Sequence, residues 1–137
     1  MDSPRILIVD DEPPARARLR ALIDAGGLGS VIGEAADGIQ TLELAAELHP
    51  DIVLLDVRMP GMNGLEAARR LAEMPRAPAV VFITAYDQHA LAAFDARAVD
   101  YLLKPVRAAR LRNALERAAI LAPAQLKALS GRTHLGS

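Results

Sequence analysis

Residues 51–64 read D-I-V-L-L-D-V-R-M-P-G-M-N-G, and no other stretch restricts the possible folds as strongly. The run at 52–55 is apolar throughout, has the length of a strand and contains β-branched residues, which is typical of a strand buried on both faces of a parallel sheet. The run ends at Asp56, and Pro60 and Gly61 then break the pattern. Asp56 is therefore predicted at the carboxyl end of a central strand, the edge at which open α/β sheets bind ligands. Alternatively, an Asp in this position has only a structural role and caps the following turn. The rest of the chain has to distinguish this structural interpretation from the functional one.

Four other short apolar runs are also predicted to be strands. They cover residues 5–9, 31–35, 79–84 and 100–103. Several strands end in polar or charged side chains, which are Asp10, Asp11 and Glu12 after the first, Thr84 at the end of the fourth, and Lys104 after the fifth. Because parallel strands present their carboxyl ends at one edge of a sheet, these side chains are predicted to share that edge.

The segments between the strands have the periodicity of amphipathic helices. The predicted helices cover about 13–24, 39–48, 65–74, 88–95 and 106–121. The fourth of them has a thin core face, with little beyond Leu91 and Phe94. Five strands alternating with five helices predict an α/β fold with a doubly wound, five-stranded parallel sheet, because each crossover between parallel strands carries a helix.

The composition agrees with one small domain. A chain of 137 residues with 52% hydrophobic residues has enough material for a single core. Its net charge of −1 gives no general attraction to nucleic acid or membranes, and the absence of cysteine excludes disulfides and thiolate metal sites. No apolar run reaches the ~18 residues of a membrane span. We therefore expect a cytoplasmic protein with one domain at 1–121 and a linker or C-terminal extension at 122–137.

The acidic residues predicted at the sheet edge favour a metal site. Asp10, Asp11 and Asp56 would repel one another unless a cation lay among them. A small, hard cation with oxygen ligands is the natural partner of such a cluster. The expected cofactor is therefore Mg²⁺, or Mn²⁺ in its place.

A cation, a carboxylate, a hydroxyl and a lysine are the groups needed to put a phosphoryl group on an aspartate. Asp56 is the predicted nucleophile because it stands alone on the central strand. Asp10 and Asp11 are adjacent, so they suit metal binding and its support. Thr84 supplies the hydroxyl.

Lys104 is the predicted ammonium of this group. Only Lys104 and Lys127 among the 16 basic residues are lysines, and a compact ammonium suits a phosphoryl oxygen better than a planar guanidinium does. Pro105 follows directly, so the bond between them is a candidate for a cis peptide that would aim Lys104 inward. An ordinary surface lysine is the alternative interpretation.

Together these motifs resemble the receiver domain of two-component response regulators. The match covers about residues 4–121 and consists of I-L-I-V-D-D-E at 6–12, L-L-D-V-R-M-P-G-M-N-G at 54–64, T-A at 84–85 and D-Y-L-L-K-P at 100–105. The resemblance implies the flavodoxin-like (βα)5 fold with strand order 2-1-3-4-5. It also implies a phosphoprotein of a phosphorelay, which takes up and loses a phosphoryl group as a switch and is not a turnover enzyme.

The same resemblance implies a role for each matching residue. Asp56 would be the phosphoacceptor, and the metal ligands would be Asp11, Asp56 and the main-chain carbonyl of Arg58, with Asp10 in support. Thr84 and Lys104 would contact the phosphoryl group, and Tyr101 would be the switch aromatic. We expect Phe82 and Phe94 in the core, and we expect the change on phosphorylation to be read out on the fourth helix, fifth strand and fifth helix.

The stretch from 84 to 106, with D-E-P-P-A-R at 11–16, looks like the receivers that precede LytTR-type DNA-binding domains. The implied function is transcription regulation, with a sensor histidine kinase as partner and DNA contacted only through an output domain that this chain lacks. The alternatives are a stand-alone regulator that acts by binding proteins, a pseudo-receiver that is not phosphorylated, and a Mg²⁺-dependent phosphohydrolase. A phosphohydrolase of this kind would have a D-x-D motif after one strand and an inserted substrate cap, whereas the acidic residues Asp10 and Asp11 here are adjacent.

The last predicted helix is rich in arginine but does not suggest a DNA-binding surface. Its arginines are Arg107, Arg110, Arg112 and Arg117. Helical spacing turns Arg112 away from Arg107 and Arg110, so they form no continuous stripe. We expect a solvated face or a homodimer face, in which these arginines pair with Asp95 and Asp100 of another copy after phosphorylation.

Overall fold

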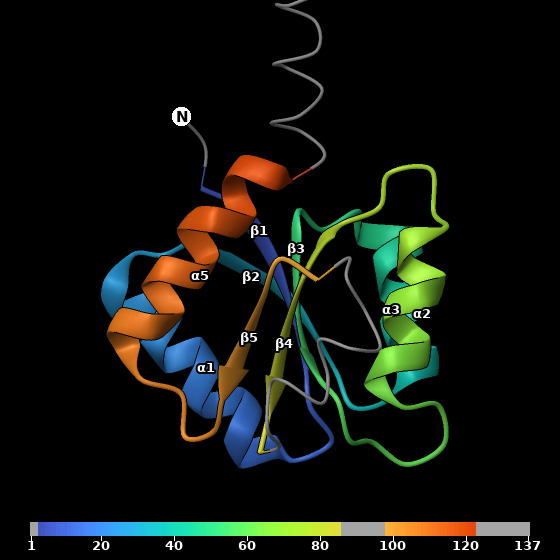
Figure 1. Ribbon diagram of the computed structural model, residues 1–137, viewed down its shortest axis with the longest axis horizontal. Coiled ribbons are helices and arrows are strands. Elements are labelled where there is room, and N and C mark those ends of the chain that lie inside the picture. Colours follow the sequence, from blue (N-terminus) through green and yellow to red (C-terminus); the bar gives the residue numbers. More distant parts are fainter. Residues whose placement is uncertain (1–2, 86–97, 123–137) are drawn as a thin grey trace, which may run out of the picture.

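The computed structural model describes residues 3–85 and 98–122 and shows one five-stranded sheet (Figure 1). The strands are β1 (Arg5–Val9), β2 (Ser30–Ala35), β3 (Ile52–Asp56), β4 (Ala79–Thr84) and β5 (Asp100–Leu103). All neighbouring strands are parallel, in the order β2-β1-β3-β4-β5. The doubly wound sheet and the strand order 2-1-3-4-5 are therefore confirmed.

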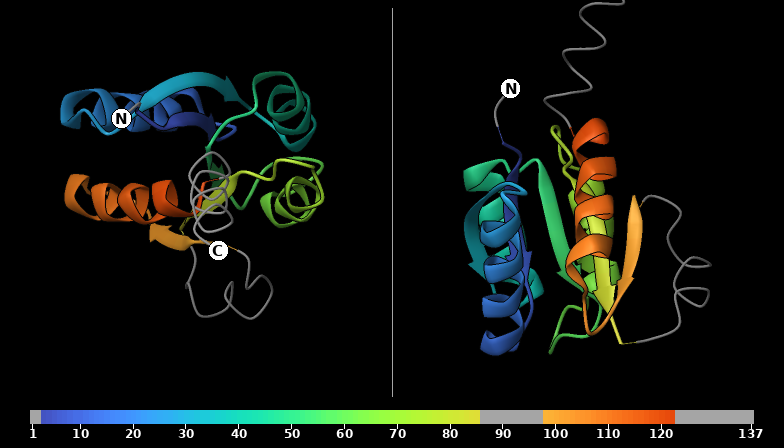
Figure 2. Two further views of the ribbon diagram at one scale, coloured as in Figure 1. Left: turned by 90° about the horizontal axis from the view of Figure 1, so that it is seen from above. Right: turned by 90° about the vertical axis from the view of Figure 1, so that its left-hand side faces the viewer.

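Helices cover both faces of the sheet. Helices α1 (Pro13–Gly26) and α5 (Ala108–Leu121) lie on one face, and α2 (Gly38–Leu48) and α3 (Gly64–Ala72) lie on the other (Figures 1 and 2). The helix predicted for 88–95 falls outside the described residues, as do Leu91, Phe94, Asp95 and the predicted extension beyond 122. No helix in the described parts of the chain combines the length and the apolar character needed to cross a bilayer.

Alternation along the strands divides the core into two layers. On β1, Ile6 and Ile8 point toward the α1 and α5 face, whereas Leu7 and Val9 point toward the α2 and α3 face. All five residues of β3 are buried, as expected for a central strand covered on both sides. Asp56 is thus held at the end of the strand that the core restrains most.

The helix ends differ from the predicted ones by about two residues. Helix α1 continues past Asp24 to Gly26, and Gly27 then ends it with φ +59°, a left-handed conformation that glycine adopts without a steric penalty. Helix α5 begins at Ala108, two residues later than predicted. The reason is that Val106 is buried in the core and Arg107 has extended backbone angles.

The turn between β3 and α3 brings the two backbones into close approach. The Gly64 amide donates a hydrogen bond to the Val57 carbonyl at 2.8 Å. A Cβ on Gly64 would collide with the Asp56 carbonyl oxygen and lie 2.8 Å from the Val57 Cα. Only glycine fits at this position, so the helix that follows the turn packs directly against the main chain of Asp56.

Candidate functional site

The parallel sheet brings the predicted site residues to one edge. Asp10 follows β1, Asp56 ends β3, Thr84 ends β4, and Lys104 follows β5. In the strand register, Asp56 pairs with Ile83 and Thr84 pairs with Leu103. The Lys104 amide also donates to the Thr84 carbonyl at 2.8 Å, so these strand ends are fixed relative to one another by main-chain bonds.

Three carboxylates converge at this edge. One carboxylate oxygen from each of Asp10, Asp11 and Asp56 lies within 4.8 Å of the others. Asp10 and Asp56 are buried, whereas Asp11 is exposed. Charged groups of like sign at this separation raise the free energy of the ionised state unless cations or hydrogen-bond donors offset the repulsion.

Both carboxylate oxygens of Asp10 are engaged by donors. Oδ1 accepts a hydrogen bond from the Glu12 amide at 2.9 Å, and Oδ2 accepts one from the Lys104 ammonium at 2.9 Å. The Asp10 amide donates to the Ala35 carbonyl on β2 at 3.1 Å. Asp10 is therefore built into the scaffold, and the exposed Asp11 beside it is the more available ligand.

The ammonium of Lys104 lies between two acidic groups. It is 2.9 Å from Asp10 Oδ2 and 3.6 Å from Asp56 Oδ2. Burial lowers the pKa of Lys104, but the hydrogen bond to Asp10 and the charges of Asp56 and Asp10 outweigh that effect, so the pKa lies above its ordinary value. The amine stays protonated at neutral pH. The Lys104–Pro105 peptide bond is cis in this structure.

The carboxyl group of Asp56 has a perturbed pKa. Burial, followed by the charge of Asp10, raises it to about 6. The Lys104 charge and a 3.4 Å hydrogen bond from the Arg58 amide lower it in part, and Asp11 raises it slightly. The surrounding protein therefore satisfies the negative charge of Asp56 only in part.

The donor set fits a small divalent cation. Three carboxylates supply only oxygen ligands, and one ammonium pairs with two of them, which leaves excess negative charge at the edge of the sheet. Mg²⁺ prefers such ligands and takes one or two carboxylates from a protein site. Asp11 and Asp56, with the main-chain carbonyl of Arg58, are the groups that could hold it, and Asp10 could support them.

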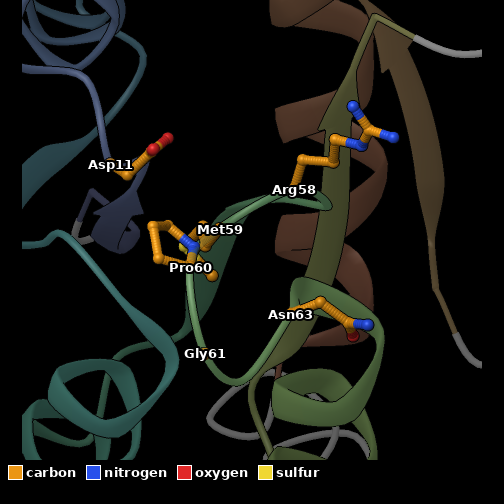
Figure 3. A pocket seen from close by; sticks show the side chains of 6 residues that line it. All are labelled: Asp11, Arg58, Met59, Pro60, Gly61 and Asn63. Carbon is orange, nitrogen blue, oxygen red and sulfur yellow. The ribbon is translucent and has the colours of Figure 1, made fainter.

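An open pocket adjoins the acidic cluster. It has a volume of about 450 Å³ and is lined by Asp11, Arg58, Met59, Pro60, Gly61 and Asn63. Figure 3 shows Asp11 opposite the loop that carries the other five residues. The pocket gives a ligand access to Asp11 from solvent.

The switch aromatic predicted at Tyr101 lies on β5 next to the core. Its ring stacks on Phe82, with ring centroids 5.6 Å apart and an interplanar angle of 25°. Phe82 is fully buried, as predicted, whereas Tyr101 is only half-buried. In this structure Tyr101 packs toward the α2 and α3 layer of the core.

Sequence reasoning missed several residues that shape the site. Arg16 of α1 donates to the Asp10 carbonyl at 2.7 Å and pairs with Glu34 of β2 at 3.0 Å. Asn63 lines the pocket and caps α3 by accepting a hydrogen bond from the Glu66 amide at 3.0 Å. The Asn63 cap had a local signal, because Asn directly before an apolar helical pattern is a typical N-cap. The role of Arg16 had no such local signal in the sequence, because it depends on contacts between different elements.

Asp100, which was expected to pair with another copy after phosphorylation, has partners within its own chain in this structure. Asp100 is buried and binds Arg110 through two hydrogen bonds, at 2.9 and 2.7 Å, within the same chain. Arg117 adds an ion pair at 3.4 Å. The hydrogen bond from Arg110 is the main cause of a pKa of Asp100 below its usual range, against the opposing effect of burial. These contacts form because α5 runs back along β5 and brings its arginines to Asp100.

Comparison with known proteins identifies relatives along most of the chain. A family model described as the response regulator receiver domain matches residues 6–116. The positive alginate biosynthesis regulatory protein of Pseudomonas aeruginosa is 49% identical over 126 residues, covering 91% of this chain and 51% of that protein. The transcriptional regulatory protein BtsR of Salmonella typhi is 42% identical over 113 residues, covering 82% and 47% respectively. The chain thus spans about half the length of the curated relatives it matches.

Solved structures agree with the sequence relatives. The signal receiver domain of NarL from Mycobacterium tuberculosis superposes with a TM-score of 0.80 at 31% identity. The match covers 87% of this chain and 98% of that domain. The flavodoxin-like architecture expected from the sequence is therefore also the architecture of a similar solved domain.

Proposed function

Since the chain belongs to the response regulator receiver domain family, we propose that it accepts a phosphoryl group on Asp56 from a sensor histidine kinase of a two-component system. The observation that carries the proposal is the convergence of Asp10, Asp11 and Asp56 within 4.8 Å, with the Lys104 ammonium beside them. Two buried carboxylates and an exposed one at the ligand-binding edge of a parallel sheet are the arrangement that such a phosphoacceptor site needs.

In the proposed reaction, a carboxylate oxygen of Asp56 attacks the phosphorus atom of the donor. A phosphorus–oxygen bond forms at Asp56 while the bond to the donor breaks, and the donor keeps that electron pair. The donor is a phosphohistidine of the kinase or a small acyl phosphate. Because the pKa of Asp56 is about 6, most of the carboxyl groups are ionised at pH 7 and ready to attack.

A divalent cation, when bound, supplies positive charge against the phosphoryl oxygens. Asp11, Asp56 and the Arg58 carbonyl would hold it, with Asp10 in support. The Lys104 ammonium and the Thr84 hydroxyl would contact the remaining phosphoryl oxygens, since both belong to neighbouring strand ends. The same site would later admit water and release phosphate, so the domain acts as a switch and not as a turnover enzyme.

The switch would act on the part of the sheet that carries Thr84 and Tyr101. Movement of Thr84 toward the phosphoryl group would free space for the half-buried Tyr101 ring, which is stacked on Phe82 in the present state. We propose that this change is read out on the segment after β4, on β5 and on α5. A homodimer formed on phosphorylation would use the exposed face of α5, whose last turn carries the exposed apolar side chains Ile120 and Leu121.

The output is proposed to be transcription regulation through a DNA-binding domain of the LytTR type outside the present sequence. The chain spans about half the length of relatives named as regulatory proteins, which leaves room for such a domain in the full-length forms. A recogniser of DNA needs a basic face, and this chain has a net charge of −1. Residues 1–137 alone are therefore not expected to bind DNA in a sequence-dependent way.

Intact-mass analysis with acetyl phosphate and Mg²⁺ tests the proposal. The wild-type chain should gain one phosphoryl group, whereas Asp56→Asn should gain none. Asp24→Asn is the matched control, because Asp24 is an exposed carboxylate at the far end of α1 and should label like the wild type. Labelling of Asp56→Asn at the wild-type rate, or equal labelling in EDTA, would contradict the assignment.

A further inference from the structure

The guanidinium of Arg16 joins two elements next to the acidic cluster. Its Nε lies 3.0 Å from Glu34 Oε1 on β2, and its Nη1 donates a 2.7 Å hydrogen bond to the main-chain carbonyl of Asp10. The side chain is 18% exposed, less than the 43% of Arg20, which pairs with the same Glu34. Arg16 is thus the more buried of two arginines that share one carboxylate partner.

The carbonyl that Arg16 contacts belongs to the peptide directly before Asp11. That peptide is planar, so a hydrogen bond to the Asp10 carbonyl oxygen also fixes the orientation of the Asp11 amide. The rotations that remain between this plane and the Asp11 carboxylate are those about the Asp11 main chain and side chain. The direction in which Asp11 points therefore depends on the contact made by Arg16.

Glu34 holds the guanidinium in the position that reaches Asp10. Arg20 occupies the other oxygen of Glu34, with its Nη2 at 2.7 Å from Oε2. The hydrogen bond from Arg20 and, after the opposing effect of burial, that from Arg16 keep the pKa of Glu34 below its usual range. Glu34 is ionised at neutral pH and holds the guanidinium group of Arg16 in place by a charge-assisted hydrogen bond.

We propose that Arg16 is a positioning residue that aims Asp11 into the metal site through the Asp10 carbonyl, with Glu34 holding its guanidinium in place. The proposal rests on the proposed function, because it assigns Asp11 to a divalent cation. Groups that do not touch the metal but hydrogen-bond to its ligands commonly control affinity for the ion. Loss of such a group lowers the metal affinity by about 10- to 100-fold.

The test is a titration of the unphosphorylated protein with Mg²⁺. Binding is monitored by NMR through the amide chemical shifts of residues 56–64. Arg16→Lys keeps the positive charge but lacks the planar guanidinium group, whose separate nitrogens reach both Glu34 and the Asp10 carbonyl. We expect its Kd for Mg²⁺ to rise about tenfold. Arg20→Lys is the control, because Arg20 pairs with Glu34 without the contact to Asp10, and its Kd should stay within about twofold of the wild type.

A second readout separates positioning from a general loss of structure. If Arg16 acts through metal affinity, the rate of labelling by acetyl phosphate in Arg16→Lys should return to within about twofold of wild type at saturating Mg²⁺. Glu34→Gln weakens the hold on Arg16 and should raise the Kd by about threefold, and it replaces Arg16→Lys in the test if that variant does not fold.

The outcomes distinguish the inference from the proposed function. An unchanged Kd in Arg16→Lys, or equal losses in Arg16→Lys and Arg20→Lys, would overturn the role of Arg16 while the proposed function stands. A folded Glu34→Gln variant with wild-type affinity would overturn the part assigned to Glu34. A wild-type protein that does not bind Mg²⁺ at all would overturn both.

Discussion

Lys104 donates its hydrogen bond to Asp10 at 2.9 Å, across 94 positions of the sequence. The same ammonium lies 3.6 Å from the Asp56 carboxylate, which is beyond a good hydrogen bond. In the resting protein Lys104 therefore neutralises the scaffold carboxylate more than the proposed nucleophile. Asp56 keeps a negative charge that burial makes unfavourable, and this cost leads to the first prediction.

We predict that Asp56→Asn stabilises the metal-free protein at neutral pH. The folded-state pKa of Asp56 is raised from 3.8 to about 6, so the unfolded state gives up its proton first as the pH rises. The free energy of unfolding of the wild type therefore falls between about pH 4 and pH 6, and it stays at the lower value above pH 6. At pH 7 in EDTA, the variant should have a free energy of unfolding higher by about 1–3 kcal/mol, measured by urea denaturation.

The difference between wild type and Asp56→Asn should shrink at pH 4, where the folded wild-type carboxyl is protonated. Asp24→Asn, which changes an exposed carboxylate, should shift stability little at either pH. An Asp56→Asn variant less stable than wild type at pH 7 would show that the carboxylate is well satisfied in the apo protein.

The second prediction concerns Lys104→Met. The charge of Lys104 lowers the pKa of Asp56, so its removal should raise that pKa above about 6. Titration of the Asp56 side-chain carbon by NMR measures the shift directly. Labelling by acetyl phosphate should also slow by at least about tenfold, since the proposed charged contact between Lys104 and the transferred group is lost. An unchanged pKa of Asp56 would contradict the observed placement of the ammonium.

The third prediction concerns Gly64→Ala. The new Cβ would collide with the Asp56 carbonyl oxygen and approach the Val57 Cα, and neither backbone atom can move without disturbing β3. We expect a loss of about 2–3 kcal/mol in the free energy of unfolding, together with slower labelling of Asp56. Gly26→Ala is the control, because its Cβ would meet only side-chain atoms of Leu28, at 3.0 Å or more. Equal stability of the two variants would contradict the close approach.

The fourth prediction concerns the ion pairs of Asp100. Because the pKa of Asp100 is lowered in the folded state, the stabilisation is present above the unfolded-state pKa and is lost as the pH falls through the folded-state pKa. Arg110→Gln should cost about 1 kcal/mol at pH 7, since the guanidinium is partly exposed, and much less at pH 2–3. Arg112→Gln, on the same helix and exposed, should change little in urea denaturation. Equal effects of the two substitutions would argue against a specific pair.

The edge of the sheet was predictable because parallel strands obey a simple rule. Apolar runs located the strands, and a shared carboxyl edge brought Asp10, Asp56 and Thr84 together without any knowledge of side-chain contacts. The match to a known family then supplied the strand order. What periodicity missed was Arg16, since its bonds to Glu34 and Asp10 depend on how α1 lies across β1 and β2.

The contacts of Asp100 within its own chain were missed for a related reason. Helical spacing describes which arginines share a face of α5, but not which residue of the sheet that face meets. In the structure, Arg110 and Arg117 are two turns apart and both reach Asp100 at the start of β5. Contacts between elements of the same chain must be known before a charge is assigned to a partner molecule.

The spread of the site along the sequence also has a consequence for protein synthesis. Asp10 and Asp11 leave the ribosome early, whereas Lys104, which pairs with Asp10 from 94 positions away, emerges only when most of the domain has been made. A stalled or truncated product that ends before β5 carries the acidic residues but lacks the ammonium, the strand that supports it and the last helix. Such a fragment has the proposed phosphoacceptor without its complete surroundings, so the proposed phosphorylation would require a chain whose synthesis has passed the fifth strand.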